Sequence, residues 1–347
     1  MRLDSVSLGL PSRQLSNGDV VALIGRESQG TFSGNLDRTI DKIRFLLNHS
    51  GAERRCWLDG EERPLDLIRR AAGNALAAAG CEQDDVDLLV YAGVDRGFLE
   101  PANAYFVADA LGMGSVQCFD VLDACNGWSR AAQIVEALLC SRAYRRALVI
   151  NAEFPMLDGG AIYPALFKLR CEEELAWCFA GYTMGEGATA SVFSHDGGSN
   201  WEFHGASRPH LADRCSVPLH GYQRYCRSSE RVGRNGVNQF TSFSGEMLPV
   251  AVAEMDALFR TLNVPIDEIR AIFPHAANRT TWDRGAAALG VRERLYHVYP
   301  RCGNLVSASI PAGIALAAGE GLIRRGDRLV TCVASAGMTF SVASFTY

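Results

Sequence analysis

The amino-acid sequence predicts an α/β protein of five alternating layers of helices and sheets, made of two duplicated halves. Two observations support this: two helix–strand patterns each occur twice at nearly the same spacing, and each half contains a helix that is apolar on almost every side. The composition agrees, because 48% hydrophobic and 21% charged residues are ordinary for a globular protein. With 347 residues, the chain has room for two units of typical domain size.

The first repeated pattern is a helix followed by an acidic turn and a strand. Residues 65–79 have the apolar spacing of a helix and stop at Gly80, a residue that favours helix C-termini. Residues 86–92 then form an almost continuous apolar run, which is typical of a strand buried on both faces. The amphipathic segment 246–262 and the strand-like segment 269–273 repeat this arrangement.

The second repeated pattern is the all-apolar helix followed by a strand. It is found at residues 126–141 and 145–150, and again at residues 307–323 and 325–330. A helix without a polar face must have protein on both sides, so we expect these two helices to lie between two sheets. Outer helices would then cover the other face of each sheet.

The two patterns agree on one spacing. Asp84 aligns with Asp267 at an offset of 183 residues, and Leu148 aligns with Leu329 at an offset of 181 residues. Agreement between two independent patterns indicates a duplicated βαβ-type unit.

A division of the chain into two halves follows from this repeat. We expect the halves to be residues 1–194 and residues 195–347. Residues 194–244, rich in Gly, Ser, His and Arg, would supply a linker, surface loops and short strands.

Charge and composition narrow the class of protein. A net charge of −5 gives no overall attraction for nucleic acid or anionic membranes, and no apolar run is long enough to span a membrane. The N-terminus lacks the apolar core of a signal peptide, and the eleven cysteines are scattered without CxxC pairs. We therefore expect a cytoplasmic protein with reduced thiols and no metal site.

Three polar residues stand where strands end or buried helices begin. Cys125 opens the first apolar helix, where free backbone N–H groups favour the thiolate, although small cysteines also pack well in buried helices. His275 directly follows the strand of the second half, and Asn304 precedes its apolar helix. Because a two-fold repeat brings equivalent ends together, we expect these three residues at one centre.

The segments around these residues resemble a known family. DVLDACNGW resembles the nucleophile motif of the β-ketoacyl-ACP synthase III enzymes of the thiolase superfamily, FPHAAN their histidine motif, and CGNLVSASIP their asparagine motif. GEGATASVF and SAGMTF resemble two further glycine motifs, in the same order. The resemblance covers nearly the whole chain and implies a thiolase-like five-layered α-β-α-β-α fold.

The resemblance also implies roles for the residues. Cys125 would accept an acyl group from a thioester, and His275 and Asn304 would donate hydrogen bonds to the thioester oxygen of the second substrate. The backbone N–H groups of Cys125 and of Ala336 or Gly337 would form the oxyanion hole. The substrates would be thioesters of CoA or of a phosphopantetheine-bearing acyl carrier protein, with no other cofactor, and the protein would be a homodimer.

Two features depart from the family pattern. Ala276 replaces the glutamine that usually follows the histidine, and the segment that stacks the CoA adenine is not recognisable before Gly51. The protein can therefore recognise CoA differently from other members of that family, or the acyl donor can be bound to a carrier protein. A basic cluster in the central loops either binds such a partner or is simply solvated; its members are Arg224, Arg227, Arg231 and Arg234.

One segment points to a particular branch of the family. DRGFLEPA, which contains Glu100, is similar to the segment of the thiolases that begin bacterial long-chain olefin synthesis. In those enzymes the glutamate is a base in the neighbouring subunit's site, and two acyl-CoAs condense head to head. Alternatively, Glu100 caps a helix starting near Pro101.

The leading hypothesis is a cysteine-dependent Claisen condensation with a malonyl thioester, in fatty-acid or secondary-metabolite synthesis. Head-to-head condensation of two acyl-CoAs is one alternative, and acyl transfer to a hydroxyl or amine is another. A third alternative, of a different functional class, is a non-catalytic partner subunit of a heteromeric ketosynthase. The presence of all three residues, Cys125, His275 and Asn304, argues against it.

Overall fold

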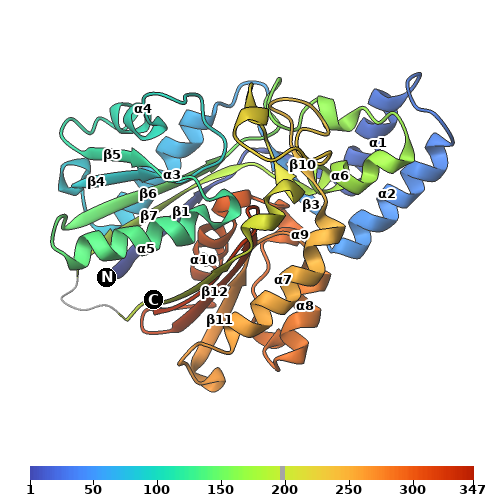
Figure 1. The fold of residues 1–347 in the computed structure, drawn as a ribbon. Helices are drawn as coiled ribbons and strands as arrows, with labels where there is room; N and C mark the ends of the chain where they lie inside the picture. Colours follow the sequence, from blue (N-terminus) through green and yellow to red (C-terminus); the bar gives the residue numbers. More distant parts are fainter. Residues whose placement is uncertain (196–199) are drawn as a thin grey trace.

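The computed structural model describes residues 1–195 and 200–347 and contains two main sheets (Figure 1). The strands of the first sheet lie in the order β1 (Arg2–Gly9), β7 (Gly187–Ser194), β6 (Arg146–Glu153), β4 (Leu88–Tyr91) and β5 (Gln117–Asp120). The strands of the second lie in the order β11 (Ile269–Pro274), β12 (Arg328–Ser335), β13 (Thr339–Thr346) and β8 (Glu202–Ser207). Short ribbons pair β2 (Arg13–Ser16) with β3 (Arg54–Trp57), and β9 (Cys215–Ser216) with β10 (Thr241–Ser242).

The two sheets have the same topology, which confirms the duplication. In the first, β6 pairs in parallel with β4 and antiparallel with β7, and β7 pairs antiparallel with β1. In the second sheet, β12 pairs in parallel with β11 and antiparallel with β13, and β13 pairs antiparallel with β8. β5 is an additional edge strand of the first sheet. β8 lies within residues 194–244, where the sequence predicts a linker, surface loops and short strands. It belongs to the second sheet because it pairs with β13.

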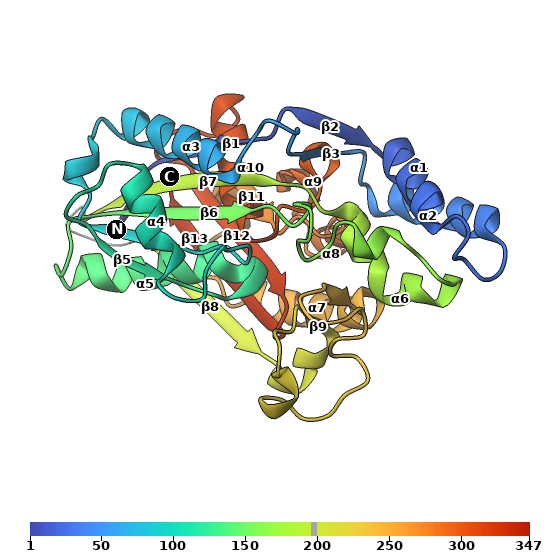
Figure 2. The same ribbon diagram turned by 90° about the horizontal axis from the view of Figure 1, so that it is seen from above.

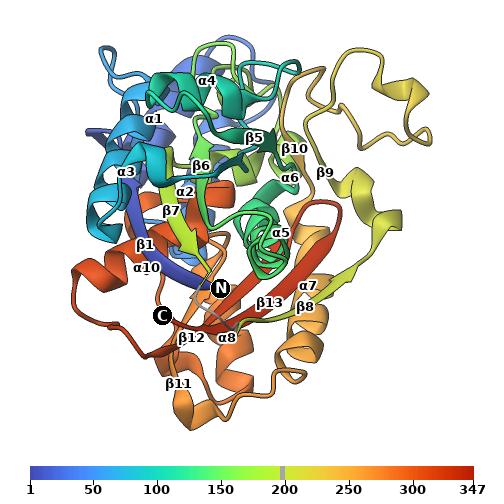
Figure 3. The same ribbon diagram turned by 90° about the vertical axis from the view of Figure 1, so that its left-hand side faces the viewer.

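The helices form the remaining three layers (Figures 1 and 3). The structure contains α1 (Asn17–Ser28), α2 (Leu36–Ser50), α3 (Pro64–Ala79), α4 (Asn103–Ala110), α5 (Gly127–Cys140), α6 (Leu175–Cys178), α7 (Ser244–Phe259), α8 (Arg279–Ala288), α9 (Tyr299–Cys302) and α10 (Ser309–Gly319). α5 and α10 lie between the sheets, α3 and α4 cover the outer face of the first sheet, and α7 and α8 cover that of the second. The predicted five-layered fold is confirmed.

The central layer explains the all-apolar helices. Trp128 and Val135 of α5 and Ile310 and Ile314 of α10 belong to one buried cluster with strand residues of both sheets. α5 starts at residue 127 and α10 at residue 309, while β6 starts at residue 146 and β12 at residue 328. The repeat is therefore 182 residues long at both places.

Helices α1 and α2 lie together at one end of the molecule, beyond the ribbon of β2 and β3 (Figure 2). α2 contains Lys42, in the stretch where no CoA-stacking motif is recognisable, and Lys42 pairs with Glu172 at 2.6 Å. Among the described residues, no helix is both long and apolar enough to cross a membrane.

Candidate active site

The structure brings the three predicted catalytic side chains together. Cys125 lies in the short turn Ala124–Asn126 directly before α5, His275 follows β11, and Asn304 lies just before α10. All three line one cavity of about 380 Å³, which we call the Cys125 cavity. Strand ends and helix starts of both halves thus meet at one centre, as the repeat predicts.

Tight local geometry holds Cys125 in place. Ala124, just before it, has a left-handed φ of 46°, and Val306 in the second half has the same conformation, with φ of 47°. A non-glycine residue pays roughly 1–2 kcal/mol for this conformation, so packing must impose it. Gly127 allows that packing, since a Cβ atom there would lie only 2.3 Å from the carbonyl oxygen of Ala92. The sulfur is therefore carried on a rigid, strained turn.

The protonation of Cys125 differs from the expectation. The sequence favoured a thiolate stabilised by the helix N-terminus, but burial raises the pKa of the Cys125 thiol well above its usual value. Nearby Cys215 and Glu153 raise it further, and contacts with Ser335 and the Cys125 backbone lower it by less. The resting group is therefore the thiol.

His275 and Asn304 form a pair at the wall of the Cys125 cavity. Their side chains are buried, and His275 Nε2 lies 3.2 Å from Asn304 Oδ1. The same Oδ1 atom accepts a hydrogen bond of 2.9 Å from the backbone N–H of Val306. Because Oδ1 accepts from the backbone, it is the oxygen of the amide, and it requires the proton of His275 to be on Nε2. The amide NH₂ of Asn304 then remains as a donor.

Burial keeps His275 neutral. It lowers the pKa of the imidazole to about 4, against smaller raising contributions from Asn304 and the backbone of Ala334. The backbone of His275 is also fixed, since its N–H donates to the carbonyl oxygen of Cys332 and its carbonyl oxygen accepts from the indole N–H of Trp282 at 2.8 Å. At neutral pH, His275 is therefore a positioned N–H donor.

The carboxyl groups of buried Glu153 and half-buried Asp95, which the sequence did not single out, also line the Cys125 cavity. Glu153, at the end of β6, accepts hydrogen bonds from the backbone N–H groups of Val94, Asp95 and Ser307 and from the Ser307 hydroxyl. Burial raises the pKa of Glu153 and of Asp95. The charge of Asp95 raises the pKa of Glu153 further, whereas a hydrogen bond from Glu153 lowers the pKa of Asp95. The pair therefore holds a proton beside the candidate nucleophile.

The internal repeat of the sequence contains a signal that points to Glu153. At the 182-residue spacing, Glu153 corresponds to Ser335 and Cys125 corresponds to Ser307. Ser307 contacts Glu153, and Cys125 contacts Ser335. The equivalent contacts thus place a polar residue at the end of β6 and of β12 against the middle residue of the turn before each buried helix, Ala124–Asn126 and Val306–Ala308.

Comparisons with known proteins agree with this arrangement. Residues 259–347 match the family model described as 3-oxoacyl-(acyl-carrier-protein) synthase III, C terminal. The resemblance to synthase III is confirmed. The beta-ketoacyl-(acyl-carrier-protein) synthase III of Clostridium perfringens is 28% identical over 308 residues, which cover 86% of this chain and 89% of that protein. The protein of the same name from Rhizorhabdus wittichii is 26% identical over 97% of this chain and 96% of its own length.

Solved structures share the fold. A cysteine variant of Xanthomonas campestris OleA with bound lauric acid and lauroyl-CoA superposes with a TM-score of 0.82, at 18% identity, over 99% of this chain and 98% of that chain. The 3-oxoacyl-(acyl-carrier-protein) synthase III of Aquifex aeolicus superposes with a TM-score of 0.80, at 21% identity, over 100% and 99% of the two chains. The thiolase-like fold is shown.

The predicted oxyanion hole is near the nucleophile. Ala336 lines the Cys125 cavity and follows Ser335, whose hydroxyl lies 3.4 Å from the carbonyl oxygen of Asp123. Gly337 has a φ of 122°, which favours glycine and turns the chain between β12 and β13. The roles of the N–H groups of Cys125 and of Ala336 or Gly337, by likeness to synthase III, stay predictions.

Glu100 lies away from this cavity. It is exposed and is not among the residues that line the Cys125 cavity. The alternative that it caps a helix is wrong, because α4 begins at Asn103 and its first N–H groups, those of Asn103 and Ala104, donate to the carboxylate of Asp120 at 2.8 and 2.9 Å. The end of β5, the next strand along the chain, therefore supplies this cap.

The structure divides the basic cluster. Arg231 is paired with Glu246 at 3.1 Å and Asp213 at 3.6 Å, and the guanidinium of Arg234 lies over the ring of Trp177. These two arginines hold the central loops together. Arg224 and Arg227 are exposed on the same loops, and for them a role in binding a carrier or CoA stays a prediction.

Proposed function

We propose that this protein is an acyltransferase of the synthase III type, which acylates Cys125 from an acyl thioester and then carries out a Claisen condensation with a malonyl thioester. The observation that carries this proposal is the meeting of Cys125, His275 and Asn304 on one largely apolar cavity. Pure acyl transfer to a hydroxyl or amine needs no pair of donors for an enolate, so the His275–Asn304 pair favours condensation.

The first half-reaction is acyl transfer. The Cys125 sulfur attacks the thioester carbonyl, and the carbonyl oxygen becomes an oxyanion. This oxyanion accepts hydrogen bonds from the backbone N–H of Cys125 and that of Ala336 or Gly337. When the intermediate collapses, the bond to the leaving thiol breaks. The proton of the Cys125 thiol leaves with that thiolate, so the acyl-enzyme forms without net charge.

The second half-reaction is carbon–carbon bond formation. The malonyl thioester loses CO₂, and the electrons of the broken carbon–carbon bond form an enolate. The enolate oxygen accepts one hydrogen bond from the NH₂ group of Asn304 and one from His275 Nε2–H, which turns to it from Asn304 Oδ1. The enolate carbon attacks the acyl carbonyl on Cys125, and the carbon–sulfur bond breaks. The sulfur leaves as a thiolate and takes a proton from solvent to regenerate the resting thiol. CoA or phosphopantetheine thioesters supply both acyl groups.

Intact-protein mass spectrometry tests the first step. The wild-type protein incubated with single acyl-CoAs should gain the mass of one acyl group, and Cys125→Ala should gain none. Cys140→Ala, which removes an exposed thiol, is the matched control and should acylate normally. Acylation that persists in Cys125→Ala contradicts the nucleophile assignment, and a wild-type protein that never acylates indicates a non-catalytic subunit.

We also propose a homodimer. Large apolar side chains are exposed around α4 and the nearby loops, and a monomer would leave them in water. They are Phe98 (46% exposed), Leu99 (79%), Tyr105 (53%), Phe106 (41%) and Leu122 (65%). Light scattering should give twice the chain mass, and Leu99→Asp should give the monomer. A monomeric wild-type protein at working concentration would contradict this proposal.

Head-to-head condensation of two acyl-CoAs is the second candidate, and the position of Glu100 favours it. Glu100 is next to the exposed apolar residues proposed as the dimer surface, so a dimer would bring it toward the partner rather than toward its own Cys125. The two candidates differ in CO₂ release. Wild-type protein that forms ketone from acyl-CoA alone, with no CO₂ from a malonyl thioester, would favour the second.

A further inference from the structure

A second cysteine lines the Cys125 cavity. Of the eleven cysteines of the chain, Cys125 and Cys215 are the two that border this space. Both are half-buried, so a molecule in the cavity can reach both sulfurs. The reaction steps proposed above use Cys125 alone and leave Cys215 without a role.

The two thiols are close enough to influence each other. After burial, the charge that Cys215 would carry as a thiolate has the largest raising effect on the pKa of the Cys125 thiol, ahead of the charge of Glu153. Because the effect of a charge weakens with distance, Cys215 is a near electrostatic neighbour of Cys125. Two neighbouring thiols on one cavity are an arrangement from which a disulfide can form.

Cys215 is carried by a short ribbon that can move toward Cys125. The strands β9 and β10 contain two residues each, and Cys215 pairs with Ser242 across the ribbon. Cys125, by contrast, is fixed on the strained turn before α5. A disulfide needs Cα atoms within about 7 Å of each other. A ribbon held by so few backbone hydrogen bonds can adjust to that distance more easily than the large sheets can.

Both thiols rest in the protonated form. Burial raises the pKa of Cys215 to about 11, against a smaller lowering contribution from Ser242, and burial also raises the pKa of Cys125. Because the thiolate is the form that attacks a disulfide, small oxidants in solution should react slowly with this pair. An oxidant that the cavity itself binds has the advantage of a high effective concentration beside the sulfur.

We propose that Cys125 and Cys215 are a redox-active thiol pair, which the disulfide of CoA oxidises to an intramolecular disulfide. The proposal rests on the proposed function, because that function places the sulfur of a CoA thioester beside Cys125. CoA disulfide presents a sulfur–sulfur bond where the thioester presents its carbon–sulfur bond. The oxidised protein has no free nucleophile, so acylation stops until a reductant restores the two thiols.

The oxidation takes two exchange steps. In the first, the Cys125 sulfur attacks one sulfur of CoA disulfide, the bond between the two CoA sulfurs breaks, and one CoA thiol leaves with the Cys125 proton. In the second, the Cys215 sulfur attacks the Cys125 sulfur, and the other CoA thiol leaves with the Cys215 proton. Two protein thiols are thereby oxidised to one disulfide, and one CoA disulfide is reduced to two CoA thiols.

The test incubates the protein with CoA disulfide, removes the excess, and then alkylates the remaining thiols of the denatured protein. In the wild-type protein, Cys125 and Cys215 should escape alkylation, and a non-reducing peptide map should join them. Cys215→Ser cannot complete the second step, so intact-protein mass spectrometry should find one CoA retained on Cys125. Cys140→Ala, which removes an exposed thiol, is the matched control and should form the link as the wild-type protein does.

A comparison of oxidants tests whether the cavity selects CoA. At equal concentration, CoA disulfide should form the link at least about tenfold faster than glutathione disulfide, and dithiothreitol should restore acylation of Cys125. A wild-type protein that does not react, retains CoA on Cys125, links other cysteines or reacts equally fast with both disulfides would overturn the proposal.

The same experiments separate this proposal from the proposed function. If acyl-CoA gives no acyl-enzyme but CoA disulfide still joins Cys125 to Cys215, the proposed function fails and the thiol pair stands. If acyl-CoA acylates Cys125 but CoA disulfide never joins the two cysteines, the thiol pair fails and the proposed function stands.

Discussion

Replacing Asn304 with alanine should slow condensation strongly and leave acylation of Cys125 nearly unchanged. The amide oxygen of Asn304 is engaged by the backbone N–H of Val306 at 2.9 Å and by His275 Nε2 at 3.2 Å. Its NH₂ group is thus the part that remains for the oxygen of the second thioester. In the proposed acyl transfer to Cys125, negative charge develops on the oxygen of the first thioester, which faces the backbone N–H groups beside the sulfur and not Asn304.

The expected loss can be estimated. Removing one donor from an oxyanion site costs about 10²–10³-fold in rate, or about 2.7–4 kcal/mol of transition-state stabilisation. The variant also leaves the buried N–H of Val306 without its acceptor, which costs about 1–3 kcal/mol of folding free energy. That penalty is below the stability of a typical folded protein, about 5–15 kcal/mol, so the variant should remain folded.

The assay separates the two half-reactions. Mass spectrometry follows the acylation rate of Cys125, and rapid quenching of pre-acylated enzyme with the second thioester follows condensation. Asn263→Ala is the matched control, because Asn263 is exposed and bonds only to Glu202 among its side-chain contacts in the described structure. If Asn304→Ala loses acylation while pre-acylated enzyme still condenses normally, the assignment of the donor to the second substrate is wrong.

Three further predictions follow from the geometry. Burial and the neighbouring Asp95 raise the pKa of Glu153 from 4.5 to about 8, so the native protein holds a proton that the unfolded chain releases, and stability should fall as pH rises through this window. Glu153→Gln should flatten that fall in urea unfolding measured at both ends of the window, and an unchanged slope would count against the raised pKa. Gly127→Ala should destabilise the fold by about 3 kcal/mol or more, because the new Cβ would meet the Ala92 carbonyl oxygen at 2.3 Å. Its control, Gly73→Ala on the open face of α3, should stabilise by about 0.5–1 kcal/mol, and equal melting temperatures for the two variants would disprove the clash. Glu100→Gln should abolish ketone formation from two acyl-CoAs if Glu100 is a base, but should change turnover of malonyl thioesters little; loss of Cys125 acylation in this variant would exclude both roles.

The sequence predicts features that depend on local pattern. The helix expected at residues 65–79 is α3, which ends at Gly80 in the left-handed conformation, because apolar spacing and a C-terminal glycine are local signals. The placement of β8 depends on its pairing with β13, far along the chain. The helix expected over residues 307–323 ends earlier, at Gly319, with Gly321 in a left-handed conformation.

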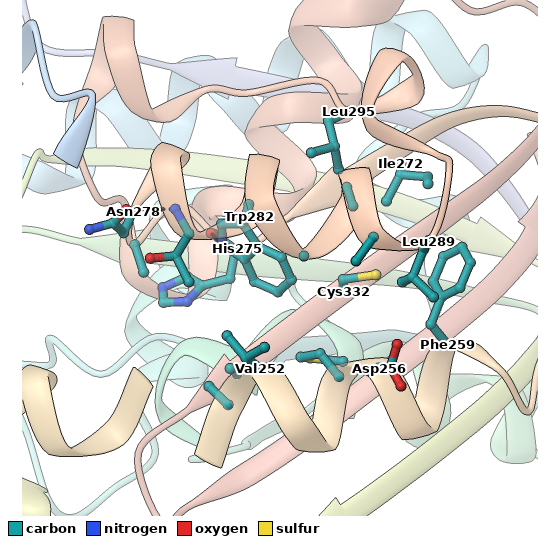
Figure 4. Close-up of a pocket in the computed structure, with 18 of the residues that line it drawn as sticks. Val252, Asp256, Phe259, Ile272, His275, Asn278, Trp282, Leu289, Leu295 and Cys332 are labelled. Atoms are coloured by element: carbon teal, nitrogen blue, oxygen red, sulfur yellow. Dashed lines mark hydrogen bonds between the residues drawn. The ribbon is translucent and has the colours of Figure 1, made fainter. Parts of the chain in front are cut away.

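The candidate site likewise has features that local motifs predict and features that depend on tertiary packing. Motifs identify Cys125, His275 and Asn304 because each marks a junction between elements, and the structure brings them to one cavity. Protonation depends on tertiary burial, and so the raised pKa of Cys125 could not be read from its place at a helix start. A cavity of about 370 Å³ between α7 and α8 likewise depends on how side chains of separate elements pack, so local patterns do not predict it (Figure 4).

The crossed contacts at the centre tie the two halves to each other. Cys125 of the first half contacts Ser335 of the second, and Ser307 of the second contacts Glu153 of the first. Each half therefore completes the other's turn, as two identical subunits would across a two-fold axis. A change in how the halves pack would alter both turns together, so the geometry around the Cys125 sulfur depends on the contact between Ser307 and Glu153 as well.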